Sequence, residues 1–335
     1  MANRIQEPLV MNKLTLKNRL VMPPMATYIA EEGGAVTDDL CKHYEARLEG
    51  GHIGLVITEH ACVNAQGRAN PRMLTLESDD VVPGLTELVR RIHAFDTPVF
   101  AQLNHAGAAT TRDISGREVI SASAVKLPSI AKVPAQEEPR AMTDAEIHSL
   151  IEDYCAAARR AKEAGYDGVE IHSAHAYLLN QFYSPLTNHR EDAYGGSLEN
   201  RLRLHIEIVR AVRETVGSEY PIALRLGACD HCEGGNGISE AVEAARLLEA
   251  AGVDVLDISG GMCRFTLEGH DEPGYFGEES AAIKAAVSIP VIVAGGVKTM
   301  DQAEDLLEKD VADLVGVGRA LLQDPLWAVK AFSKH

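Results

Sequence analysis

The chain has 335 residues, and its 32 Lys and Arg against 49 Asp and Glu give a formal net charge of −17 at neutral pH. Because the acidic residues are spread along the chain, this charge argues against sequence-independent binding to nucleic acid or to an anionic membrane. The most apolar stretch, 281–297, is interrupted by Lys284 and Pro290 too soon for a membrane span, and six cysteines are too few for a dense disulfide framework, so a cytoplasmic location is expected.

Eight short runs predict β-strands in chain order. Most of the runs are continuously apolar, which is typical of parallel strands whose two faces are both covered. They span residues 18–25, 53–60, 98–104, 168–173, 221–227, 255–261, 290–296 and 314–320.

Amphipathic helical stretches with recognisable ends lie between several of these runs. Thr143 and Glu146 have the spacing of a capping box, and apolar residues follow them at helical intervals. Each of the other two predicted helices has a serine at its start and a glycine at its end. The predicted helices run from Thr143 to Gly165, from Ser197 to Gly217 and from Ser239 to Gly252.

Eight strand–helix units in a row favour a closed (β/α)₈ barrel of the TIM type, an α/β fold in which residues 1–335 form a single domain. The alternative is an open α/β sheet. Residues 4–20 are expected to form a hairpin under the barrel. The long polar connection 105–142 is expected to be an insertion after the third barrel strand, at the end where active sites of such barrels form.

Polar residues gather at the predicted carboxyl ends of these strands. Glu170 and His172 share one face of their strand, so they are expected to point into the barrel. Gln102 ends the third strand. Arg225 falls on the inward face of the fifth strand, where a guanidinium must meet an anion or strong acceptors. The alternative for Arg225 is a purely structural ion pair with Glu170.

The last two barrel strands end in glycines. Backbone N–H groups at such turns often hold phosphate in this fold, and a neighbouring arginine adds a bidentate charge. The alternative is that the glycines serve only to turn the chain. The predicted phosphate site comprises Gly295, Gly296, Gly318 and Arg319.

The segment HSAHAY places His172, His175 and Tyr177 close together. Its spacing differs from the helical pattern of zinc hydrolases, in which two histidines lie four apart with a glutamate between them. Buried histidines that satisfy neighbouring backbone are a second alternative. We favour a third interpretation, in which two imidazole N–H groups donate to one developing oxyanion while the Tyr177 phenol donates a proton.

Cys229 and Cys232 form a CxxC after the fifth strand. One such pair without a second is weak evidence for zinc or an iron–sulfur cluster, so thiols without a fixed role are the preferred interpretation. No metal site is predicted.

Taken together, these segments resemble the old yellow enzyme family of FMN-dependent ene-reductases, in particular the bacterial branch similar to the reductase domain of 2,4-dienoyl-CoA reductase. The likeness covers nearly the whole chain, because the motifs occur in the family's order. HSAHAYLLNQFYSP and YGGSLENR are its most specific parts. The others are KNRLVMPPM, VNAQGR, AQLNHAG, LRLGA, AGGV and GVGRALLQDP.

The resemblance implies FMN bound without covalent attachment, with NAD(P)H as reductant. Gln102 would hydrogen-bond the pyrimidine edge of the flavin, and Arg225 would lie beside N1 and the C2 carbonyl. The glycines and Arg319 named above would hold the phosphate. Further residues expected to line the flavin are Pro24, Met25, Ala26 and His60.

The resemblance also implies a substrate, a small unsaturated carbonyl compound. His172 and His175 would hold its carbonyl oxygen, and Tyr28 would approach it from the first loop. Hydride would reach the β-carbon from the flavin while Tyr177 protonates the α-carbon. No nucleic-acid or membrane partner is implied, and a homo-oligomer is left open.

Departures from the family's pattern leave alternative functions open. Ala26 stands where many relatives have Thr or Cys near the flavin, and His60 stands where a small residue is usual. GGMCRF, 260–265, lacks the histidine that resembles a second proton donor in dienoyl-CoA reductases, and the chain lacks the cysteine cluster of the larger relatives, so no iron–sulfur cluster is expected. A flavin-dependent amine or cyclic-ketone dehydrogenase is the nearest alternative function, and a metal-dependent hydrolase using His172 and His175 is a distant one.

Overall fold

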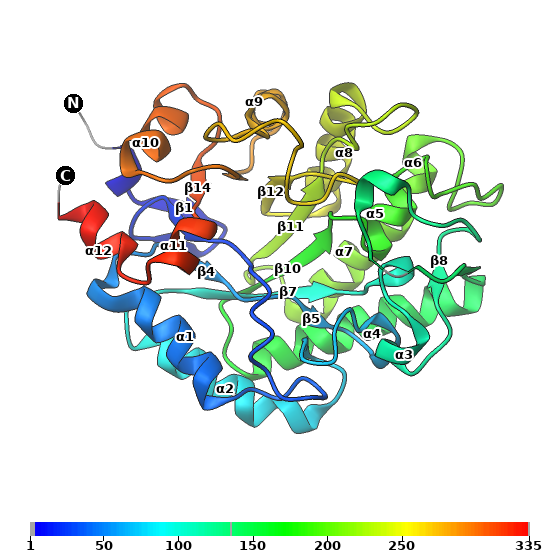
Figure 1. The fold of residues 1–335 in the computed structure, drawn as a ribbon, viewed down its shortest axis with the longest axis horizontal. Helices are drawn as coiled ribbons and strands as arrows, with labels where there is room; N and C mark the ends of the chain where they lie inside the picture. Colours follow the sequence, from blue (N-terminus) through cyan, green and yellow to red (C-terminus); the bar gives the residue numbers. More distant parts are fainter. Residues whose placement is uncertain (1–3, 135, 334–335) are drawn as a thin grey trace.

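The computed structural model describes residues 4–134 and 136–333. Eight parallel strands form a closed barrel, which confirms the predicted (β/α)₈ fold and all eight predicted strands (Figure 1). Hydrogen bonding between β10 and β7 closes the ring, so the open-sheet alternative is wrong. In chain order the barrel strands are β3 (Leu20–Met22), β4 (Leu55–Ile57), β7 (Val99–Asn104), β10 (Gly168–Ser173), β11 (Ile222–Gly227), β12 (Val255–Ser259), β13 (Val291–Ala294) and β14 (Leu314–Gly316).

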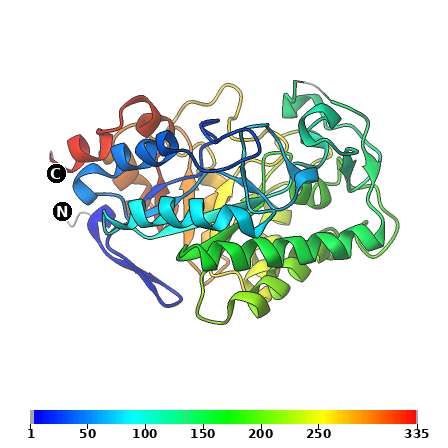
Figure 2. The same ribbon diagram turned by 90° about the horizontal axis from the view of Figure 1, so that it is seen from below.

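Helices surround the barrel, and α2 and α4 run side by side along one flank (Figure 2). None of the helices in the described ranges is long and apolar enough to cross a membrane. The outer helices are α1 (Asp38–Leu48), α2 (Val82–His93), α4 (Asp144–Glu163), α7 (Arg203–Val216), α8 (Ile238–Ala251), α9 (Gly277–Lys284), α10 (Met300–Glu308), α11 (Arg319–Gln323) and α12 (Trp327–Phe332). The short helices are α3 (Arg112–Ser115), α5 (Leu178–Tyr183) and α6 (Leu198–Arg201).

Strand alternation sorts the side chains as predicted. Val169 and Ile171 pack outward into the large core shared with the helices. Glu170 and His172 alternate with them on β10 and are buried on the opposite, inner face. The barrel interior therefore becomes polar toward the carboxyl ends of its strands.

The predicted hairpin is present and closes the other end of the barrel. Strands β1 (Leu9–Met11) and β2 (Leu14–Leu16) pair antiparallel. Met11 and Leu16 pack in one apolar cluster with inward residues of the barrel strands, such as Phe100 and Ile292. This apolar plug fills the amino-terminal end of the barrel. Ligands therefore have access from the opposite end, the mouth formed by the carboxyl ends of the strands.

The capping box at Thr143 and Glu146 is confirmed, with both reciprocal hydrogen bonds formed. Two other predicted boundaries need correction. The helix predicted from Ser197 to Gly217 is divided at Leu202, which ends α6 and begins α7. The helix predicted to start at Ser239 starts one residue earlier, because the backbone N–H of Gly237 donates to Glu240 and Gly237 caps it.

The predicted strands 18–25 and 53–60 are too long, since the structure has only Leu20–Met22 and Leu55–Ile57 as strands there. The predicted strand 314–320 is also too long. It ends at Gly316, and Arg319 is the first residue of α11. The long connection 105–142 has structure of its own, since β8 (Ile120–Ser121) pairs with β9 (Arg140–Ala141). Two further short strands, β5 (Ala61–Cys62) and β6 (Leu74–Thr75), extend the sheet beside β7.

The plug yields a stability prediction. Leu16→Ala should leave a cavity in the barrel floor and lower the free energy of unfolding by about 2–5 kcal/mol. Val10→Ala in the same hairpin is the matched control, because Val10 is 64% exposed and its loss should cost less than about 0.5 kcal/mol. Urea unfolding followed by circular dichroism measures both. Equal midpoint shifts would contradict the packing of the hairpin into the barrel.

Candidate active site

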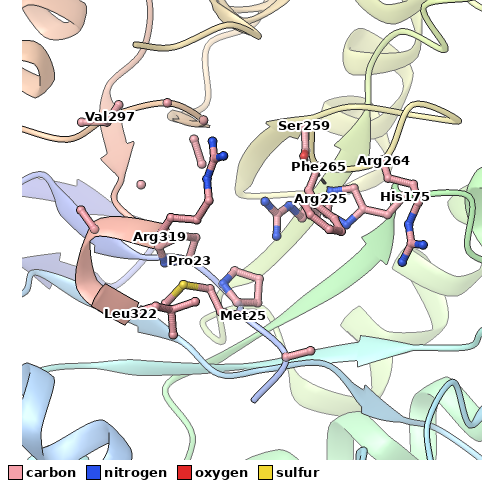
Figure 3. A pocket seen from close by; sticks show the side chains of 18 of the residues that line it. Pro23, Met25, His175, Arg225, Ser259, Arg264, Phe265, Val297, Arg319 and Leu322 are labelled. Carbon is pink, nitrogen blue, oxygen red and sulfur yellow. Dashed lines mark hydrogen bonds between the residues drawn. The ribbon is translucent and has the colours of Figure 1, made fainter. Parts of the chain in front are cut away.

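A cavity of about 670 Å³ opens at the carboxyl ends of the barrel strands, within the usual range of small-molecule sites. Figure 3 shows Arg225, His175 and Arg264 on one side of it, with Arg319, Met25 and Leu322 on the other. Every site residue predicted from the sequence lines this cavity. These are Pro24, Met25, Ala26, Tyr28, His60, Gln102, His172, His175, Tyr177, Arg225, Gly295, Gly296, Gly318 and Arg319.

The two histidines of HSAHAY meet edge to face at one wall of the cavity. Their ring centroids are 4.9 Å apart, and the Tyr177 ring lies 5.1 Å from that of His172. His172 sits on β10, whereas His175 lies after it in a left-handed conformation with φ of 62°. This turn, and a left-handed Ala176 next to it, carry the chain back so that both rings and the phenol reach one space.

Hydrogen bonds within the protein leave one ring N–H of each histidine for a ligand. Nδ1 of His172 accepts the backbone N–H of Ala174 at 3.3 Å, which places the proton of a neutral ring on Nε2. Nε2 of His175 lies 2.7 Å from Oγ of Ser259, and in the tautomer in which this hydroxyl donates, the ring proton is on Nδ1. The pair can then donate two hydrogen bonds to one oxygen.

Burial keeps these imidazoles uncharged. It is the main cause that holds the pKa of His172 and of His175 well below the usual 6.5, and the positive charge of Arg225 acts in the same direction. Burial likewise raises the pKa of Tyr177 above the usual 10 of a phenol, although the nearby Arg264 opposes the shift. At neutral pH the wall therefore presents two neutral imidazoles and a protonated phenol.

Under the histidines lies a buried polar floor. Nε2 of Gln102 donates to Oε1 of Glu170 at 2.8 Å. Arg225 forms an ion pair with Asp257 of β12, with 3.1 Å between Nε and Oδ2. The alternative that Arg225 pairs with Glu170 is therefore wrong. Burial raises the pKa of Glu170 and of Asp257.

His60 occupies the space between this floor and the tyrosine. Its ring centroid is 5.3 Å from that of Tyr177, and its Nδ1 lies 3.0 Å from the amide nitrogen of Asn104. Burial lowers the pKa of His60 to about 4, so it too is neutral at physiological pH.

The opposite end of the cavity is built by glycines. Gly295 and Gly296 have φ of 134° and 68°, which side chains other than glycine rarely adopt. A Cβ on Gly295 would stand 2.9 Å from the Tyr275 ring, and one on Gly296 would collide with the carbonyl oxygen of Glu272. Gly318 and the exposed Arg319, whose guanidinium donates to the Tyr275 hydroxyl at 3.2 Å, complete this end.

The cavity fits an FMN on two counts. The amide of Gln102 and the guanidinium of Arg225 line its floor, each held from behind by a buried carboxylate, Gln102 by Glu170 and Arg225 by Asp257. Such groups can serve the polar edge of a heterocycle. The glycine turns at the other end leave backbone free to approach a phosphate, with Arg319 beside it.

Sequence reasoning missed several residues of this cavity. Arg264 and Phe265 follow β12, and the sequence predicted no role for either of them. The segment 260–265 was notable in the sequence only because it lacks a histidine. Ser259 and Asp257, which orient His175 and Arg225, lie on the inward face of β12, and strand alternation could have identified them. Tyr275 comes from a connection without a recognisable pattern.

The CxxC cysteines do not enter the cavity lining, and both carry free thiols. Burial raises the pKa of Cys229 and of Cys232, which makes their thiols less reactive. Within residues 4–134 and 136–333, no three His, Cys, Asp or Glu side chains gather in a way that could hold a metal ion.

Comparisons with known proteins agree with this geometry. Residues 4–335 match the sequence model of the NADH:flavin oxidoreductase / NADH oxidase family. The chain is 39% identical over 332 residues to an NADPH dehydrogenase of Halalkalibacterium halodurans, covering 99% of this chain and 94% of the relative. It is 40% identical over 324 residues to an NADH oxidase of Thermoanaerobacter brockii, covering 95% of this chain but only 49% of that longer protein.

Among solved structures, the old yellow enzyme homologue from Zymomonas mobilis superimposes with a TM-score of 0.86 at 28% identity, covering 98% of this chain and 92% of the other. The match spans the barrel and the segments that line its mouth. The chain therefore belongs to the NADH:flavin oxidoreductase / NADH oxidase family, and the resemblance to old yellow enzyme carried by its motifs is confirmed.

Proposed function

We propose that this protein is an NAD(P)H-dependent ene-reductase that binds FMN in a single barrel domain and reduces the C=C bond of α,β-unsaturated carbonyl compounds. FMN and NAD(P)H are the cofactor and the reductant of the family. The observation that carries the proposal is the neutral His172–His175 pair facing the Tyr177 phenol in one cavity. When bound, FMN would supply the hydride-transfer chemistry between NAD(P)H and the β-carbon of the alkene, and the residues below would hold the reactants and the proton.

The floor and the glycine end would hold the FMN. Arg225 would lie against the pyrimidine edge, where its charge favours the anionic reduced ring, and Gln102 would donate or accept beside it. Gln102 is oriented by Glu170 and Arg225 by Asp257, so neither side chain must be ordered when the flavin binds. Gly295, Gly296, Gly318 and Arg319 would receive the phosphate.

The histidine pair would hold the substrate carbonyl. As negative charge develops on this oxygen, two N–H donors fixed in advance stabilise it without having to reorganise. Each such donor is worth about 10²–10³ in rate. Because both imidazoles are neutral, they polarise the carbonyl without donating a full proton to its oxygen.

Tyr177 would complete the reduction. One hydride and one proton must add across the alkene, and the phenol supplies the proton to the α-carbon, then recovers one from solvent. Its burial beside His60 and His172 fixes the hydroxyl near the histidine wall. Tyr28, which is 55% exposed at the rim, would cover the substrate from the solvent side.

Flavin binding is the first test. Purified protein reconstituted with FMN should be yellow, and Arg319→Leu should weaken FMN binding about 10- to 100-fold because one charged phosphate contact is lost. Arg117→Leu removes an equally exposed arginine outside the cavity and should change nothing. Fluorescence titration of apoprotein with FMN measures the dissociation constants. A wild-type protein that binds no flavin would refute the proposal.

Tyr177→Phe should separate the two half-reactions. It should slow reoxidation of the reduced flavin by 2-cyclohexenone about 10²- to 10⁴-fold, because the proton donor is lost, and spare reduction by NAD(P)H. Tyr154→Phe is the control, since the Tyr154 hydroxyl is buried away from the cavity without a hydrogen-bond partner. Stopped-flow absorbance measures each half-reaction. If Tyr177→Phe left the rate of reoxidation unchanged, Tyr177 would not be the proton donor. If amines reduced the flavin and NAD(P)H did not, the dehydrogenase alternative would be favoured.

The pH dependence of reoxidation follows from the pKa shifts. A histidine whose pKa is lowered stays neutral until the pH falls well below 6.5, and a phenol whose pKa is raised stays protonated until the pH rises above 10. The rate constant with saturating 2-cyclohexenone should therefore vary less than about twofold between pH 6 and pH 9. A fall toward acid with an apparent pKa near 6.5 would mean that the pair titrates normally.

A further inference from the structure

We propose that Arg264 is an anion-binding residue of the substrate site, so that the preferred substrates are unsaturated carbonyl compounds that carry a carboxylate. The proposal rests on the proposed function and names the substrate class of the same cavity. It is carried by a guanidinium that has no carboxylate partner among the described residues and lies beside the histidine pair and the tyrosine.

Arg264 lies at the reacting end of the cavity. Its guanidinium carbon is 5.9 Å from the centroid of the Tyr177 ring and 5.5 Å from that of Phe265 (Figure 3). Its charge is close enough to contribute to the lowered pKa of His60, His172 and His175. A group bound by Arg264 would therefore be near a carbonyl oxygen held by the histidines.

No acidic residue neutralises this guanidinium. Within the described ranges, no carboxylate forms an ion pair with Arg264, and its Nε is buried without a hydrogen-bond partner. The other two arginines of the cavity differ, because Arg225 is paired with Asp257 and Arg319 lies at the glycine end. The guanidinium contacts the aromatic rings of Tyr177 and Phe265 rather than a carboxylate, and a half-buried cation without a carboxylate partner favours binding of an anion from solution.

The backbone holds Arg264 in a costly conformation. Its φ is 64°, in the left-handed region that residues other than glycine rarely adopt. The turn is fixed by Oδ1 of the buried Asp230, which accepts the N–H of Met262 at 3.0 Å, and by the Arg264 N–H, which donates to Gly261 at 3.0 Å. Strain that the surroundings enforce in this way is typical of functional positions.

The walls next to Arg264 are apolar. Phe265 and Tyr28 line the cavity while remaining 54% and 55% exposed. Large exposed aromatic side chains at a cavity rim are typical of surfaces that a ligand covers. The cavity thus presents an apolar wall with one charged group, which suits a substrate with an apolar body and a single carboxylate.

Phosphates of the reductant are a second source of negative charge. When the nicotinamide lies over a flavin, its nearest phosphate is one ribose away, and the 2′-phosphate of NADPH lies beyond a pyrophosphate and a further ribose. Arg264 instead lies against Tyr177, within the space of the reacting atoms. The geometry therefore favours a carboxylate on the substrate, and the experiment includes the reductant as a separate arm.

The test compares (E)-4-oxo-2-pentenoate with its methyl ester, which have the same skeleton and differ in charge. Reduced, FMN-loaded wild type and Arg264→Leu, Arg264→Gln and Arg264→Lys variants are mixed with each compound, and reoxidation is followed. Lys132→Leu is the control. Lys132 lies outside the cavity and pairs with Glu268, which belongs to the same loop as Arg264. Reduction of each variant by NADPH and by NADH is measured separately.

We expect Arg264→Leu and Arg264→Gln to lower the acid-to-ester ratio of kcat/KM about 10- to 100-fold, mostly through KM. Arg264→Lys should retain part of the ratio, and Lys132→Leu all of it. In titrations of oxidised enzyme, the ratio of dissociation constants for 4-hydroxybenzoate and its methyl ester should shift in parallel. This spectroscopic readout does not depend on turnover.

Distinct outcomes would overturn the proposal. If the acid-to-ester ratio of kcat/KM stayed unchanged in every Arg264 variant, Arg264 would not bind the carboxylate. If both compounds were still reduced, the proposed function would nevertheless hold. A loss confined to NADPH reduction would assign Arg264 to the dinucleotide instead. If the variants lose flavin, the wild type decides, because an acid-to-ester ratio of kcat/KM that does not fall with rising ionic strength would contradict binding of the carboxylate by a cation.

Discussion

The chemistry of this site depends on keeping two imidazoles uncharged inside a cavity that also holds guanidinium groups. Burial is the largest cause of the lowered pKa of His172 and His175, and the neighbouring arginines act in the same direction. A protonated imidazole next to Arg225 would be strongly disfavoured, so the pair remains a source of hydrogen bonds rather than of protons. In the proposed mechanism, proton donation is thereby left to Tyr177, whose pKa is raised by the same burial.

The charges of the cavity divide along its length. Arg225 is neutralised by Asp257 under the histidines, and Arg319 lies by the glycine turns. Arg264 lies near the tyrosine and has no carboxylate partner among the described residues. One ligand with a heterocycle and a phosphate can use the first two arginines. Arg264 therefore remains for a substrate that binds above that ligand.

Much of the fold and site could be predicted from the sequence, since parallel strands buried on both faces give apolar runs that are easy to recognise. Strand alternation within 168–173 predicted that Glu170 and His172 point into the barrel. The glycines after the last two strands predicted the opposite end of the cavity. Residues contributed by long connections could not be found this way. Arg264 and Tyr275 lie in 260–276, where no periodicity exists and tertiary contacts such as the Asp230–Met262 hydrogen bond set the backbone.

The central claim is that a flavin lies beneath a pair of neutral imidazoles that hold one ligand oxygen. A crystal structure of the FMN-loaded protein with 4-hydroxybenzaldehyde tests it most directly. The account predicts the isoalloxazine over Arg225 and Gln102 and the phenolate oxygen within about 3.2 Å of a nitrogen of both His172 and His175. A flavin bound elsewhere, or a phenol that contacts neither imidazole, would contradict it.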